Sequence, residues 1–198
     1  MPQLPPITKA LMLICTAVFC VQQLFGYWLE AFFALWPLAS GHFMPWQVIS
    51  YAFLHGSVTH LFFNMLGLWM FGSEIEQIWG RQRYIHFLIA SALAGAVAQM
   101  LVGLIGPSGP TLGASGALFG LLLAFGMLFP DRIIMPLFPP IPMKAKYFVA
   151  IFGALELLMG VFGGSGIAHF AHLGGMLGGW LMIRFWRGQA PFPPRRRR

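Results

Sequence analysis

The sequence has 198 residues, of which 58% are hydrophobic and only 9% are charged, and its mean hydropathy is +0.75. A soluble domain usually carries about 25% charged residues, so this composition excludes a water-soluble enzyme, a disordered chain and a secreted disulfide scaffold. The formal net charge of +7 would suit binding to nucleic acid, but the Lys and Arg residues flank apolar segments or end the chain. That placement indicates a membrane-topology signal and no nucleic-acid partner.

Apolar runs long enough to cross a hydrocarbon core, which takes about 20 helical residues, follow one another along the chain. We predict an all-α polytopic membrane protein with six spans, at roughly 9–26, 59–79, 84–105, 114–129, 146–164 and 167–186. Lys9 precedes the first run as in a signal peptide, but five further spans follow and favour an uncleaved helix. Cys15 and Cys20 lie in this run without metal-site spacing and are expected only to pack.

The basic residues predict the orientation of these spans. All 12 Lys and Arg residues fall on one side of the six-span arrangement, since the stretches 27–58, 106–113 and 165–166 contain none. They are Lys9, Arg81, Arg83, Arg132, Lys144, Lys146 and the arginines within 184–198. The positive-inside rule then places both termini in the cytoplasm. We expect an integral protein of the plasma (inner) membrane, with 187–198 as a basic cytoplasmic tail that serves topology more than lipid anchoring.

Two segments differ from ordinary loops and spans. The stretch 27–58 is rich in Trp and Phe and has one charged residue, Glu30, so we expect a partly structured loop in the outer leaflet. The fourth span, of roughly 16 residues, gives about 24 Å of helix against a core of about 30 Å. Asp131 and Arg132 fix its inner end near the membrane surface, so its outer end stops below the external surface. This predicts a water-filled cavity opening outward, with Ser115 at its floor.

Two polar residues within the spans suit nucleophilic catalysis. Ser115 begins the fourth span, where helix N–H groups are free, and His172 lies in the sixth span, where an imidazole is costly to bury. Three glycine pairs, 116/120, 174/178 and 175/179, would let these two spans meet at backbone contact and bring the serine oxygen to the imidazole. Each feature has a simpler explanation by itself, because glycine pairs often serve only packing and a histidine can be satisfied by any polar neighbour.

His60 and Asn64 lie four residues apart near the outer end of the second span, so they share a helix face. Both side chains can donate hydrogen bonds to one point, which a developing oxyanion requires. Polar contact between helices is the alternative explanation.

Several other polar residues are assigned structural roles or none. Glu74 and Glu76, near the inner end of the second span, predict a structural ion pair rather than chemistry. His169 stands one turn before His172 and could orient it, although packing is the favoured interpretation. Glu156 in the fifth span receives no role.

Four separated motifs, taken together, resemble the rhomboid family of intramembrane serine proteases. They are His60-Leu-Phe-Phe-Asn64-Met, Gly72-Ser-Glu-Ile-Glu76-Gln-Ile-Trp-Gly80, Gly113-Ala-Ser115-Gly and Ala171-His172-Leu-Gly-Gly. They come in the family's order on the second, fourth and sixth spans, and the resemblance runs from about Trp46 to Gly179. It implies a single rhomboid-like domain, a bundle of six transmembrane helices, over 1–198.

The resemblance also implies the site. Ser115 would be the nucleophile and His172 the general base and acid, a dyad without a carboxylate, and we expect no acidic residue near either. His60, Asn64 and the backbone N–H of Ser115 would form the oxyanion hole. The residues expected to support the site are Gly113, Gly116, Phe119 and Gly175. No cofactor and no metal is implied.

Two positions depart from the family's pattern. Phe119 stands where the family often has a tyrosine that stacks on the base, and a phenylalanine can still stack. Trp46 matches a Trp-Arg pair whose arginine is Gln47 here. Neither change removes a chemical group from the expected reaction.

The expected activity is cleavage of transmembrane segments near their outer end through an acyl-enzyme. Its partners would be single-span or polytopic membrane-protein substrates and the lipid bilayer, with substrates entering between the second and fifth spans. Two other functions remain open. A catalytically inactive rhomboid-like binding protein would lack the serine or the histidine, and a transporter would need a polar path through the inner half of the bundle, which is apolar here.

Overall fold

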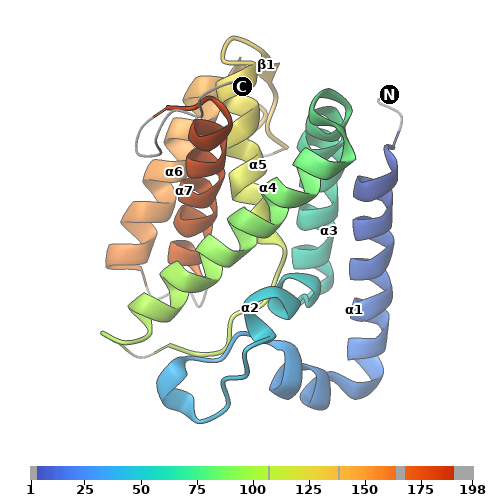
Figure 1. The fold of residues 1–198 in the computed structure, drawn as a ribbon, viewed down its shortest axis with the longest axis vertical. Helices are drawn as coiled ribbons and strands as arrows, with labels where there is room; N and C mark the ends of the chain where they lie inside the picture. The colour runs from blue at the N-terminus through green and yellow to red at the C-terminus, as the bar shows by residue number, and fades with distance from the viewer. Residues whose placement is uncertain (1–3, 107, 138, 164–167, 190–198) are drawn as a thin grey trace.

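The structure, a computed structural model, describes residues 4–106, 108–137, 139–163 and 168–189. These residues form a helical bundle (Figure 1). Its helices are α1 (Pro6–Phe33), α2 (Gln47–Ser50), α3 (Val58–Gly67), α4 (Ser73–Val102), α5 (Ser115–Leu128), α6 (Ala145–Phe162) and α7 (His169–Trp186). Single turns η1 (Leu38–Ser40) and η2 (Tyr51–Phe53), a wider turn η3 (Leu68–Gly72) and the antiparallel strands β1 (Ile133–Ile134) and β2 (Met143–Lys144) complete it.

Three stretches of the described chain are long and apolar enough to cross a membrane, namely α1, Val58–Val102 and α6, and α5 is a shorter apolar helix. The stretch Val58–Val102 is interrupted at Gly80, which has φ 74° and ψ 166°, a conformation that favours glycine. The chain reverses direction within this stretch (Figure 1), so its two arms correspond to the predicted spans 59–79 and 84–105. The count of six spans stays a prediction.

The first predicted span, roughly 9–26, ends where α1 is kinked. The helical stretch runs to Phe33, but Phe25 has φ −129° and ψ 28°, so two helical parts meet there. The predicted span corresponds to the part before the kink, and the stretch 27–58 begins with the helical part after it. The bounds of the span and of the outer loop stay predictions.

The rest of the stretch 27–58 is partly structured, as predicted, and the fully buried side chain of Gln47 holds it together. Its Oε1 accepts from the backbone N–H groups of Trp36 and Met44, at 3.3 and 3.1 Å. Its Nε2 donates to the carbonyl groups of Phe32 and His42, at 3.3 and 3.1 Å. The glutamine at the position where the resemblance places an arginine thus satisfies four backbone groups of this loop.

Helix α7 packs mainly on α4 and α5, and glycines make these contacts possible. A Cβ at Gly175 would fall on the carbonyl oxygen of Gly116, and one at Gly120 would lie 2.9 Å from the carbonyl oxygen of Gly175. A Cβ at Gly174 or Gly178 would instead lie 2.6 or 2.8 Å from carbonyl oxygens of α4. The prediction that all the glycine pairs join the fourth and sixth spans is therefore wrong for 174/178, since neighbouring residues of a helix face different partners.

The segments that carry the described basic residues gather at one end of the bundle. The start of α1, the reversal within α4, the β1–β2 hairpin and the end of α7 lie together there, and α2 lies at the opposite end (Figure 1). The one-sided distribution of bases along the sequence is therefore also one-sided in space.

The two glutamates at the end of the second predicted span differ in their surroundings. Glu74 forms an ion pair with Arg132, with 3.0 Å between its Oε1 and Nη2, as predicted. Glu76 is buried and makes no such pair among the ion pairs of the described residues. Its carboxylate accepts from the backbone N–H groups of Ile7 and Thr8, at 2.9 and 2.7 Å, and from the Thr8 hydroxyl at 2.8 Å. It therefore caps the first turn of α1, whose N–H groups have no helical partners.

Glu76→Ala is expected to lower the free energy of unfolding by about 2–4 kcal/mol, because it leaves buried N–H donors without an acceptor. The matched control is Glu74→Ala, which removes a carboxylate two residues away from a partly exposed ion pair and should cost about 0–1 kcal/mol. Thermal unfolding of both variants in the same detergent measures the difference. Equal losses would contradict the capping role of Glu76.

Candidate functional site

Ser115 is the first residue of α5, and the turn before it depends on glycine. Gly113 has φ 125°, a conformation that side chains rarely adopt, and a Cβ there would lie 2.8 Å from Nε2 of His60. As the first helical residue, Ser115 has a backbone N–H with no carbonyl partner within the helix. The turn therefore ends at a residue that offers both a hydroxyl group and a backbone N–H without a helical partner.

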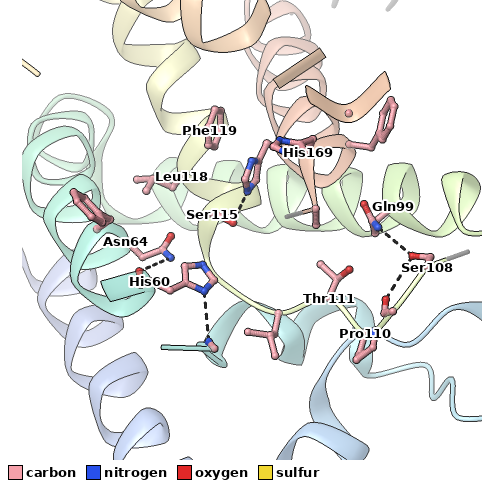
Figure 2. A pocket seen from close by; sticks show the side chains of 18 of the residues that line it. His60, Asn64, Gln99, Ser108, Pro110, Thr111, Ser115, Leu118, Phe119 and His169 are labelled. Carbon is pink, nitrogen blue, oxygen red and sulfur yellow. Dashed lines mark hydrogen bonds between the residues drawn. The ribbon is translucent and has the colours of Figure 1, made fainter. Parts of the chain in front are cut away.

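The structure brings Ser115 and His172 together, although they lie on different helices. The Oγ of Ser115 is 2.8 Å from the Nε2 of His172 (Figure 2). Phe119, one turn along α5, stacks on the imidazole with ring centroids 4.3 Å apart and an angle of 5° between planes. This contact confirms that phenylalanine can stack at this position.

A carboxylate lies on the other side of the His172 ring. The Oε2 of Glu156, on α6, is 2.8 Å from Nδ1 of His172 and 2.6 Å from Nδ1 of His169. The prediction that no acidic residue lies near the serine or the histidine is therefore wrong. The favoured interpretation of His169 as a packing residue is also incomplete, because its ring bonds this carboxylate.

Glu156 and His172 meet because their helices are antiparallel neighbours. Helices α6 and α7 run side by side in opposite directions (Figure 1). Glu156 lies six residues before the end of α6 at Phe162, and His172 lies three residues after the start of α7 at His169. An acidic residue in an apolar span, level with a histidine of the next span, was the available signal.

The atoms of Glu156, His169 and His172 that can bind a metal lie within 4.8 Å of one another. Three such groups can surround a metal ion with one position left open. In the structure they are joined by hydrogen bonds, which already satisfy the carboxylate and both Nδ1 atoms.

His60 and Asn64 both lie beside Ser115, on α3 (Figure 2). The Nδ1 of His60 accepts a long hydrogen bond of 3.5 Å from the backbone N–H of Gly56, which leaves Nε2 to carry the proton. A Cβ built on Gly113 would lie 2.8 Å from that Nε2 and 3.6 Å from Ser115 Oγ, so the two side chains lie close to the same point. A substrate oxygen placed between Ser115 Oγ and His60 Nε2 would meet the N–H donor of His60. Asn64 Nδ2 donates one of its two N–H groups to the carbonyl of His60 at 3.0 Å, which leaves a second donor.

These side chains line one open cavity of about 940 Å³. Its polar walls include His60, Asn64, Gln99, Ser108, Ser115 and His172. The loop between α4 and α5 and the start of α3 form part of its rim (Figure 2). A cavity whose lining includes Ser115 is present among the apolar helices. That it is filled with water, opens outward and has Ser115 at its floor stays a prediction.

The fold and the site define a helical integral membrane protein with a serine–histidine pair in a polar cavity. The rhomboid domain family matches residues 42–188. The chain belongs to the rhomboid family.

Curated relatives carry the same family name. Rhomboid protease GlpG of Serratia proteamaculans (strain 568) is 30% identical over 189 residues, covering 91% of this chain and 62% of that protein. Rhomboid protease GlpG of Yersinia pestis (strain Pestoides F) and of Yersinia pseudotuberculosis (serotype O:3, strain YPIII) are each 28% identical over 187 residues, covering 93% of this chain and 63% of those proteins. The chain therefore spans less than two thirds of the length of these relatives.

Proposed function

We propose that this protein is an intramembrane serine endopeptidase that cleaves transmembrane segments of other membrane proteins. The observation that carries the proposal is the 2.8 Å contact between Ser115 Oγ and His172 Nε2 at a polar cavity among apolar helices. Membership of the rhomboid family and the name of the relatives, rhomboid protease, support the same activity.

The proposed reaction is a two-step acyl transfer. Ser115 attacks a substrate carbonyl carbon while His172 Nε2 takes the hydroxyl proton, and His172 then gives that proton to the leaving amine. A water molecule, activated by His172, hydrolyses the resulting ester and restores the serine. The negative oxygen of each tetrahedral intermediate lies near His60 Nε2 and the backbone N–H of Ser115, where fixed donors stabilise it.

Asn64 completes the proposed oxyanion hole as a third donor. Its Nδ2 carries two N–H groups, of which one donates to the helix carbonyl of His60 at 3.0 Å. The other remains for the substrate oxygen. We therefore propose His60, Asn64 and the Ser115 N–H as the donors of the oxyanion hole.

The proposed orientation places six spans in the membrane, both termini in the cytoplasm and the cavity open to the outer side of the plasma (inner) membrane. The clustering of basic segments at the end opposite α2 supports it (Figure 1). Substrates would enter between the second and fifth predicted spans and be cut near their outer end. Gly, Ala, Ser or Pro near that point would favour cleavage, because the substrate helix must unwind to expose a carbonyl.

Reconstitution tests the proposal. The purified protein in liposomes should cut a single-span substrate that has Gly and Ala near one membrane boundary, and mass spectrometry of the products gives the bond cleaved. A matched substrate with Leu at these positions should be cut at least about tenfold more slowly, because it lacks the glycine that weakens the substrate helix where it must unwind. Cleavage only in the extramembrane part of both substrates, or no cleavage of either, would contradict an intramembrane protease.

A further inference from the structure

We propose that Glu156 is a positioning residue for the base: it fixes the tautomer and orientation of His172 and stabilises its positive charge during proton transfer. This inference rests on the proposed protease function and changes its site from a dyad to a serine–histidine–glutamate triad. The geometry points to it because His172 is bonded at both ring nitrogens. Nδ1 faces the Glu156 carboxylate at 2.8 Å and Nε2 faces the Ser115 hydroxyl at 2.8 Å.

The first step of the argument concerns the proton on the ring. An ionised carboxylate only accepts hydrogen bonds, so a neutral His172 must carry its proton on Nδ1 to bond Glu156. The lone pair of Nε2 then faces the serine hydroxyl, which is the arrangement that a general base needs. In the other tautomer Nε2 would donate to Ser115 Oγ and could not take its proton.

The second step concerns charge. His172 is 7% exposed and Glu156 has 14% of its side chain exposed, so water screens neither group well. When His172 takes the serine proton it becomes a cation, and a carboxylate in contact stabilises that cation more strongly here than in water. Glu156 stays ionised throughout and receives no proton. The other titratable rings near His172 are His169, on the same carboxylate, and His60, and neither carries negative charge.

The third step concerns the position and orientation of the His172 ring. The plane of the His172 ring is set by Phe119, which stacks on one face. Rotation within that plane is set by the two hydrogen bonds at opposite ring atoms. The carboxylate is itself held by His169, whose Nδ1 is 2.6 Å from the same oxygen. Three helices therefore determine the position of one imidazole.

A purely structural role for Glu156 and a positioning role predict different kinetics for a variant that lacks the carboxylate. Glu156 lies on α6, a peripheral helix, and its bonds to α7 could serve only as a strut between these helices. If these bonds only hold the two helices together, their loss would loosen α6. Because the proposed substrate path runs beside α6, such loosening would raise activity or change KM. Loss of a positioning residue would lower kcat and leave KM nearly unchanged, because substrate binding does not involve Glu156.

Glu156→Gln in liposomes tests the proposal, since it keeps the size of the side chain and removes the charge. We expect kcat to fall about 10²-fold, with KM within about twofold of the wild-type value, because an amide can donate to Nδ1 and favour the wrong tautomer. Labelling of Ser115 by a fluorophosphonate should slow in parallel. Glu30→Gln, which removes a carboxylate from α1, is the matched control and should keep wild-type kinetics. Unchanged or raised kcat in Glu156→Gln would overturn the proposal.

A spectroscopic measurement separates this inference from the proposed function and does not depend on substrate. In ¹⁵N-histidine-labelled protein, an imidazole N–H that bonds a carboxylate gives a far-downfield proton signal. We expect one such signal to disappear in His172→Ala, to shift in Glu156→Gln and to persist in Ser115→Ala. If wild-type protein shows this signal but cuts no substrate, the proposed function fails while the triad geometry stands. Loss of wild-type activity in EDTA would mean that a metal ion occupies the three groups, and would overturn the triad.

Discussion

Ser115→Ala is expected to lower kcat about 10⁶-fold, to the limit of detection, in the liposome assay. The serine oxygen forms the bond to the substrate carbonyl, and among the described residues no other hydroxyl is hydrogen-bonded to the His172 ring. The change removes one oxygen atom next to an otherwise intact turn, so the helix bundle should keep its thermal stability. Cleavage by Ser115→Ala at more than background rate would exclude the proposed mechanism.

A serine-directed fluorophosphonate probe separates loss of the nucleophile from loss of other groups. Labelling should require Ser115 and His172, since the probe reports an activated hydroxyl. The contrasting variant is Asn64→Ala, which should slow turnover about 10²-fold or less and still be labelled, because an oxyanion donor contributes to the rate but supplies no nucleophile. Labelling of His172→Ala at the wild-type rate would argue against the histidine as base.

Gly175→Ala is expected to lower the free energy of unfolding by about 3 kcal/mol or more and to remove most of the activity. The added methyl group would fall on the carbonyl oxygen of Gly116, a backbone atom that cannot rotate away. Helices α5 and α7 must then separate, and these helices carry Ser115 and His172. A displacement of about 1 Å between two reacting groups can cost about 10²-fold in rate.

Thermal unfolding and fluorophosphonate labelling of the same preparation measure both effects of Gly175→Ala. The matched control is Gly26→Ala in α1, where an added Cβ has no atom within 4 Å. That variant should keep full activity and lose no stability. Wild-type activity in Gly175→Ala would show that the site does not depend on close contact between α5 and α7.

The sequence predicted the main members of the candidate site because each motif carries local information. Gly113, Ser115 and Gly116 mark a helix start after a turn that needs positive φ, and the contact of Ser115 with His172 has the distance that catalysis requires. Phe119 stacks on the base as expected, since a helix places residue 119 one turn after residue 115. The catalytic roles of these residues stay predictions until the variants are measured.

Contacts between helices were predicted less well. Gly174 and Gly178 face α4 and not α5, although both were expected to join α5 and α7. A repeat of small residues shows that a helix is closely packed, but it does not say which neighbour each face meets.

The sequence by itself determined that this protein lies in a membrane, that its bases fall on one side of its apolar segments, and that Ser115 and His172 are the residues to pair. Hydropathy, charge and glycine spacing are properties of the amino-acid sequence, so they can be read without knowledge of the fold. Only the tertiary structure decided that the carboxylate of Glu156 lies against the base. That contact joins two helices through side chains whose rotation and partners depend on packing, and 2.8 Å of separation cannot be read from spacing along a sequence.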